Sequence, residues 1–188
     1  MVTWLKPALR EAHPFLHAAT KIRDVKDDDG LNIEALEISA DQQHLLIGFR
    51  SPLLDNRALI ASVENHPAMF EVNEPIRVSN ALITLDLAGD GIRGMSWLPV
   101  LNAYLVISGP ASGKQVQFKL WRWSGQADEP ARRLNVPGLP GFEHAEGVCP
   151  AVIDGQPKII LVSDDGSRKQ NRFARFLLLE PAQLDLDP

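Results

Sequence analysis

Three charged residues in similar stretches of sequence are the strongest candidates for chemistry. Glu34, Arg93 and Glu146 each stand near the start of a short apolar segment. Asn32 and His144 precede the two glutamates by two residues, so the alternation of a strand would point them to the same side. We therefore predict a ligand-binding site made of these five side chains.

The residue types in this set fit more than one kind of chemistry. Carboxylate, amide and imidazole groups are donors that calcium or a similar divalent ion accepts, and Glu34, Glu146 and Asp164 are the candidate metal ligands. Arg93 would instead bind an anionic ligand through its guanidinium fork. A third interpretation is structural: the charges pair with one another, because an unpaired buried charge costs several kcal/mol. For Asp164, in SDDGS, the alternative is turn chemistry.

Other sequence signals for catalysis are weak. The stretch GPASGKQ lacks the spacing of a phosphate-binding loop, and Ser108 and Ser112 have no G-x-S-x-G context. Cys149 is the single cysteine, which excludes an intrachain disulfide and a cysteine cluster for zinc. Its apolar surroundings, GVCPAV, predict a buried side chain.

Three repeated units must position the candidate residues. Each unit consists of a short strand, a tight turn, an apolar strand, a loop and a third strand, with ALITLDLA and ARRLNVP as fourth strands of the first two units. This pattern predicts an all-β, propeller-like fold of about three four-stranded antiparallel blades. The expected blades are residues 30–88, 89–138 and 139–188, which together form one domain.

The segment before the first unit differs in character. The stretch PALREAHPFLHAA opens with Pro7, a favourable first residue of a helix, and Pro14 would interrupt that helix. We expect residues 1–29 to form a helical and loop lead-in.

Several motifs, taken in order, resemble those of a bacterial family known as domain of unknown function 3616. They are NIEAL…LLIGFRSPL, LDLAGDGIRGMSW, YLVISGPASG, LWRW and AEGV…ILVSDDG, between about Pro14 and Leu179. The resemblance implies a propeller built on N-x-E-G-L units and implies no established activity. Two features depart from the family pattern: Ala35 replaces the usual Gly, and the N-terminal part of the pattern is missing.

Composition and charge limit the classes of partner. The net charge of −5 and the pI near 5.5 argue against a nucleic-acid partner, which normally meets a basic face. No apolar run approaches the ~18 residues that span a bilayer, and the N-terminus lacks an apolar signal-peptide core. We therefore expect a cytoplasmic protein that does not bind membranes.

Three blades cannot close a ring, so their end faces need cover. We expect a homodimer of two three-bladed copies, or a second chain that completes the propeller. A further alternative is that the N-terminal segment with Trp4, Phe15 and Leu16 folds back as a cap.

Two functions from different classes are compatible with this fold. The first is a binding or scaffold protein that holds a small ligand or a partner at the channel or loop face. The second is a metal-dependent hydrolase of an ester, lactone or phosphoester, with calcium held by Glu34 and Glu146. A loose likeness of AEGV…ILVSDDG to motifs of calcium-dependent lactonase-like propellers favours the second only by analogy of fold.

Overall fold

The protein is mostly β-structure in the computed structural model, which describes residues 5–25, 28–112, 118–136 and 144–186. The helices are α1 (Leu5–Ala12), α2 (Pro14–Ala19) and α3 (His66–Glu71), with short 3-10 turns η1 (Pro99–Leu101), η2 (Arg168–Gln170) and η3 (Pro181–Gln183). No helix of the described residues is long and apolar enough to cross a membrane.

The first sheet is an antiparallel meander in sequence order. It contains β1 (Asn32–Ile38), β2 (Leu45–Ser51), β3 (Ala58–Val63) and β4 (Ile83–Leu85). Asp55 and Asn56 adopt positive φ in the tight turn between β2 and β3, a conformation that Asn and Asp tolerate better than most residues.

The second and third sheets repeat this layout with different strand numbers. The second sheet contains β5 (Asp90–Leu98), β6 (Ala103–Pro110), β7 (Lys119–Trp123) and β8 (Arg132–Asn135), with β12 (Asp185–Leu186) added beside β8. The third contains β9 (Ala145–Ile153), β10 (Gln156–Ser163) and β11 (Phe176–Leu179). The all-β class is thus confirmed, but four strands in every blade is wrong, because the last strand of the chain pairs with the second sheet.

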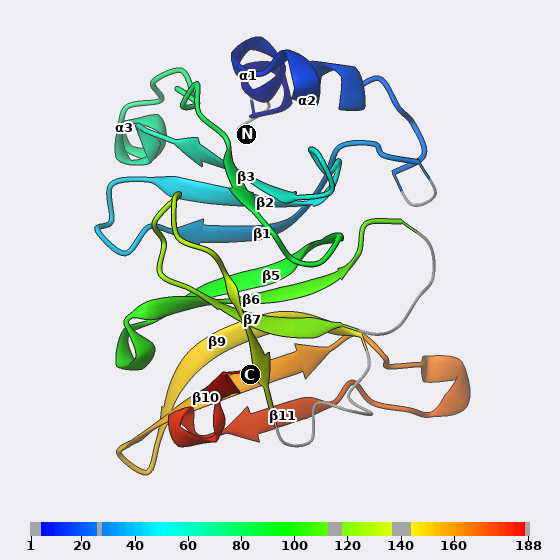
Figure 1. Ribbon diagram of the computed structural model, residues 1–188, viewed down its shortest axis with the longest axis vertical. Coiled ribbons are helices and arrows are strands. Elements are labelled where there is room, and N and C mark those ends of the chain that lie inside the picture. The colour runs from blue at the N-terminus through cyan, green and yellow to red at the C-terminus, as the bar shows by residue number, and fades with distance from the viewer. Residues whose placement is uncertain (1–4, 26–27, 113–117, 137–143, 187–188) are drawn as a thin grey trace.

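The three sheets stack face to face, as Figure 1 shows. Alternate residues of a strand point to opposite faces of its sheet. In β6, Tyr104 and Val106 pack toward the first sheet, whereas Leu105 and Ile107 pack toward the third. The middle sheet is therefore buried on both faces, and its two cores fix the spacing of all three sheets.

Helices α1 and α2 cover the outer face of the first sheet (Figure 1). Leu9 and Leu16 are fully buried there against the outward-facing residues of β2 and β3, among them Ile47, Phe49 and Leu59. The fold-back of the N-terminal segment, with Phe15 beside Leu16, thus supplies a cap; Trp4 lies outside the described residues.

Two glycines mark places where the backbones come very close. A Cβ at Gly91 would overlap the carbonyl oxygen of Arg50, so the start of β5 approaches the end of β2 too closely for any side chain. At Gly48, a Cβ would lie 2.9 Å from the Ala35 Cβ and from Ile92. These contacts hold the first and second sheets close together near β1.

Two local expectations differ from the structure. Helix α3 was not expected, because His66–Glu71 lies in a region dominated by strand-like runs. Asn65 holds the ends of that insertion together: its side chain donates to the Pro75 carbonyl and accepts from the Arg77 N–H, both at 2.8 Å. Cys149, expected to be buried, is exposed.

Candidate functional site

Arg93 forms ion pairs with both glutamates that the sequence singled out. Its Nε lies 3.0 Å from Glu34 Oε2, and its Nη2 lies 2.8 Å from Glu146 Oε1. The three residues come from β1, β5 and β9, the first strands of the three sheets. The corresponding positions of the three units therefore meet, with the guanidinium between two carboxylates.

The second oxygen of Glu34 is also occupied. Glu34 Oε1 pairs with Arg50 Nη1 at 3.2 Å and accepts a hydrogen bond from Asn32 Nδ2 at 3.2 Å. Arg50 also donates from Nε to the Pro110 carbonyl at 3.1 Å, which ties β2 to the end of β6. We call Glu34, Arg50, Arg93 and Glu146 the ion-pair cluster.

The ion-pair cluster balances two carboxylates with two guanidinium groups. The side chains of Arg50 and Arg93 are 12% and 14% exposed, so the pairs are largely shielded from water. Each charge has a partner in a neighbouring strand or sheet, which is the arrangement that a buried charge requires. This geometry joins the three sheets at one end of their first strands.

Sequence reasoning missed Arg50. It ends the apolar run LLIGFR of β2, and a lone arginine at the end of such a run is the signal that could have revealed it. Register explains its position: Ser51 pairs with Asn32, so the end of β2 lies beside the start of β1.

His144 and Asp164 meet through the backbone. The Asp164 N–H donates to the His144 carbonyl at 2.9 Å, and His144 has a φ of 54°. No hydrogen bond or ion pair among the described residues joins the His144 side chain to the ion-pair cluster. The roles of His144, Asn32 and the cluster in ligand binding stay predictions.

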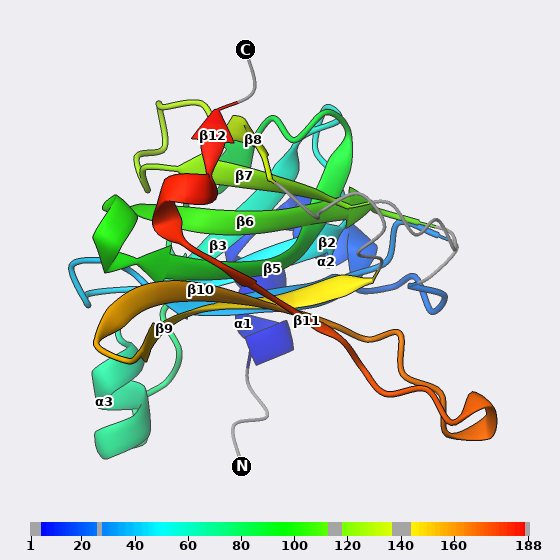
Figure 2. The same ribbon diagram turned by 90° about the horizontal axis from the view of Figure 1, so that it is seen from below.

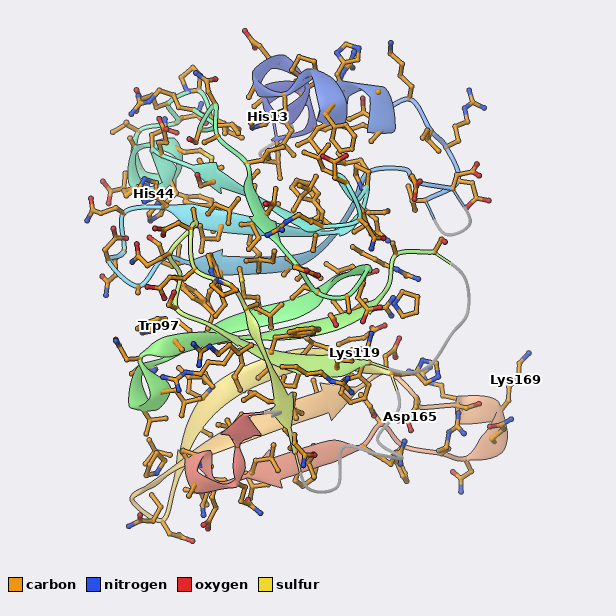
Figure 3. All side chains as sticks on the ribbon, viewed as in Figure 1. His13, His44, Trp97, Lys119, Asp165 and Lys169 are labelled. Atoms are coloured by element: carbon orange, nitrogen blue, oxygen red, sulfur yellow. The ribbon has the colours of Figure 1, made fainter. Side chains whose placement is uncertain are left out.

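In SDDGS it is Asp165, not Asp164, whose carboxylate is buried. It accepts hydrogen bonds from Ser163 Oγ and from Arg175 Nε, the latter at 2.7 Å. The bond from Ser163, followed by Arg175, lowers the pKa of the Asp165 carboxyl. These contacts hold the hairpin between β10 and β11, consistent with turn chemistry for this stretch. Asp165 and Lys169 lie on the same side of the molecule in Figure 3.

Glu34, Glu146 and Asp164 do not form a cluster of metal donors in the described structure. Within residues 5–25, 28–112, 118–136 and 144–186, no three His, Cys, Asp or Glu side chains gather closely enough to hold a metal ion. Both oxygens of Glu34 already face cationic groups. Calcium binding at these residues stays a prediction.

A second polar network fastens the strands of the second sheet. Asp90 Oδ2 accepts from Ser108 Oγ and pairs with Lys119 Nζ, both at 2.8 Å. Ser108 Oγ also accepts from the indole N–H of Trp121 at 2.8 Å. Ser108 is fully buried with its proton directed at a carboxylate, so this network links β5, β6 and β7 structurally.

Comparison with known proteins gives one result. The family described as "Protein of unknown function (DUF3616)" matches residues 9–176, which is most of the chain. No curated protein and no solved structure matches the sequence. The matched segment contains the ion-pair cluster and most of the stacked sheets. The chain therefore belongs to the DUF3616 family.

Proposed function

We propose that this protein is a binding scaffold without catalytic turnover, and that it pairs with a second copy of itself through one face of the third sheet. The observation that carries the proposal is an apolar sheet face that no helix or other sheet of the described residues covers. Its exposed or half-buried residues come from all three strands: Cys149, Ile160, Val162, Phe176 and Leu178. We call these five residues the open face.

Strand register places these side chains together. Ile160 pairs with Cys149 on one side and with Leu178 on the other, and Val162 pairs with Phe176. Their neighbours Ile159, Leu161 and Leu179 are buried against the second sheet. Since side chains alternate along a strand, the open face lies on the opposite side of the sheet. Figure 2 looks toward it, and no helix or other sheet of the drawn ribbon lies over it.

The exposure of this face is high for large apolar side chains. Phe176 is 69% exposed, Val162 44% and Leu178 41%. A contiguous apolar patch on a sheet indicates an interaction surface. The two contacts between sheets within the chain, first with second and second with third, bury apolar faces of the same kind. A further sheet is therefore the partner that continues the existing stacking.

In a second copy of the chain, the open face is the outer sheet face that is available for pairing. The outer face of the first sheet is already covered by α1 and α2 through Leu9 and Leu16. Two copies can therefore meet with their open faces against each other, related by a two-fold axis that uses the same patch twice. A ring of two three-bladed copies would also need the covered face of the first sheet, so we propose the two-fold pair instead.

The ion-pair cluster supports a scaffold more than a hydrolase. Three of its four carboxylate oxygens pair with arginines, which disfavours a role for them as general base or metal ligand. If the alternative metal-dependent hydrolase were right, Ca²⁺ would raise the melting temperature and EDTA would lower it. We expect neither to shift the melting temperature, and a calcium-dependent shift lost in Glu34→Gln would favour the hydrolase.

Sedimentation equilibrium over a wide range of protein concentrations tests the pairing. We expect a concentration-dependent dimer that Phe176→Glu converts to a monomer, because a buried, unpaired carboxylate opposes association. Phe70→Glu is the matched control, since Phe70 on α3 is 68% exposed but lies on a different element. Both variants must keep the circular dichroism spectrum of the parent.

Cys149 gives a second measurement that needs no introduced label. As the single cysteine of the chain, it reports on the open face. We expect its rate of alkylation by iodoacetamide to fall as protein concentration rises, and to stay constant in Phe176→Glu. A monomer at every concentration, or a dimer that Phe176→Glu leaves intact, would contradict the proposed pairing.

A further inference from the structure

A cavity lies near the far ends of β1 and β5, where Glu37 and Trp97 are found instead of Glu34 and Arg93. It has a volume of about 750 Å³, within the size range of small-molecule sites. Its principal polar and aromatic lining comes from β1, the following turn, α3 and β5: Glu37, Ser39, His66, Ser96 and Trp97. We call it the Trp97 cavity. In Figure 3, Trp97 and His44 lie on the side of the molecule opposite Lys119 and Asp165.

The indole of Trp97 is held in place by other aromatic rings. Its ring centroid lies 5.0 Å from that of Tyr104 in an edge-to-face contact, and Tyr104 in turn lies 5.1 Å from Trp123. Tyr104 is fixed as well, because its hydroxyl oxygen accepts the Ala40 N–H at 2.8 Å. The cavity thus has a rigid aromatic wall, and among aromatic side chains tryptophan binds cations best.

Glu37 supplies a fixed negative charge beside that wall. Its Oε2 accepts the Trp97 N–H at 3.1 Å, and its Oε1 accepts the Ile38 N–H at 2.9 Å. Both bonds come from neutral backbone donors, so they orient the carboxylate without neutralising it. No lysine or arginine of the described residues lines the cavity.

The lack of a counter-ion distinguishes Glu37 from comparable acids. Among the described residues, four other acidic side chains are at least half-buried, and each has a lysine or arginine partner: Glu34, Glu74, Asp90 and Asp165. Glu37 has no ion pair with a described residue. A half-buried carboxylate without a cation is costly unless something else supplies the charge.

Ser96 adds an unused hydrogen-bonding group. It is 7% exposed and lines the cavity, and its hydroxyl makes no hydrogen bond with another residue in the described part of the chain. Buried polar groups normally have a partner. A hydroxyl without one, next to a carboxylate without a counter-ion, suits a ligand that carries N–H donors.

From this combination we infer that the Trp97 cavity binds a small organic cation, namely a primary ammonium group attached to an apolar body. The ammonium bonds to Glu37 and Ser96, and the apolar body packs against the indole of Trp97. This inference does not depend on the open face, because no residue of that face lines the cavity.

Isothermal titration with benzylammonium chloride tests the inference, with benzyl alcohol as the neutral probe of similar shape. We expect the cation to bind and the alcohol to bind at least tenfold more weakly. We expect the affinity for benzylammonium to decrease in high salt, because screening weakens the attraction to Glu37. In an NMR titration, the indole N–H signal of Trp97, identified by its loss in Trp97→Phe, should shift with the cation.

Two variants separate this site from binding elsewhere on an acidic protein. Glu37→Gln should weaken benzylammonium binding at least tenfold. Glu71→Gln makes the same change in net charge at an exposed side chain that does not line the cavity, and it should leave the binding unchanged. If Glu37→Gln does not fold, Trp97→Phe decides by the same loss of affinity. Equal binding of cation and alcohol, no binding at millimolar concentration, or unchanged affinity in the folded variants would overturn the inference.

Discussion

Arg93 of the second sheet and Glu34 of the first are joined by an ion pair with 3.0 Å between Nε and Oε2. Both side chains are largely buried, at 14% and 22% exposed, so replacing Arg93 by Met leaves the carboxylates of Glu34 and Glu146 without that partner. We expect a loss of about 2 kcal/mol in the free energy of unfolding, between the values for exposed and fully buried pairs.

Urea denaturation of Arg93→Met measures this loss. Arg77→Met is the control, because the Arg77 side chain is 57% exposed and pairs with Glu74 on the surface. Its effect should stay below about 0.5 kcal/mol. Similar losses in the two variants would show that the ion-pair cluster does not join the sheets as described.

The close approach at Gly91 predicts a strong and specific intolerance of side chains. Gly91→Ala should prevent stable folding, because the new methyl group would overlap the Arg50 carbonyl and neither backbone has room to move. Gly155→Ala tests the contribution of backbone conformation alone, since Gly155 has a φ of 74° with nothing within 4 Å of its Cβ position. We expect that variant to fold and to lose about 1 kcal/mol in thermal unfolding. A well-folded Gly91→Ala would contradict the geometry between β2 and β5.

Removing the side chain of Leu16 tests the N-terminal cap. Leu16 is fully buried in the core between the helices and the first sheet, so Leu16→Ala should lower the free energy of unfolding by about 2–5 kcal/mol. Phe15 is the neighbouring control: it is 37% exposed, and Phe15→Ala should cost less than about 1.5 kcal/mol in the same chemical denaturation. An equal loss in the two variants would argue that the helices do not pack through Leu16.

His13 makes stability depend on pH at the same cap. Burial lowers the pKa of His13 below its ordinary value of 6.5, although a hydrogen bond with the Ser79 backbone partly opposes this. The unfolded chain therefore takes up the proton more readily than the folded protein. The contribution of His13 is complete above pH 6.5 and is lost as pH falls from 6.5 through the lower folded pKa, by at most about 1.4 kcal/mol per pH unit.

Urea denaturation at a series of pH values between 5 and 8 measures this dependence. The expected decrease in stability below pH 6.5 should be smaller in His13→Gln than in the parent protein. His17→Gln, in the following turn of α2, should keep the full decrease. A pH profile that is identical in His13→Gln and the parent protein would rule out this role for His13.

The sequence predicted the strands and the meeting of Glu34, Arg93 and Glu146 because both follow from local repetition. Each first strand occupies the same place in its unit, so stacking the units brings equivalent positions together. Trp121 and Trp123, in the third strand of the second unit, both lie in the core between the first and second sheets.

Other features depend on contacts that no local pattern encodes. The position of Arg50 in the ion-pair cluster follows from the pairing of β1 with β2, and the pairing of β12 with β8 follows from the path of the chain after η3. Cys149 was expected to be buried because its stretch is apolar, but β9 has one buried face and one open face. An apolar strand at the end of a stack looks the same in sequence as one in the middle.

Asp185 of β12 pairs with Asn135 of β8, so two strands of the second sheet pair with each other across the whole stretch of chain that forms the third sheet. This pairing joins segments far apart along the chain. The loss of chain entropy on closing that loop must be offset by the contacts that form with it. Unfolding of the third sheet from the C-terminal end of the chain therefore first requires that β12 separate from β8. We expect these two sheets to exchange amide hydrogens as a single cooperative unit.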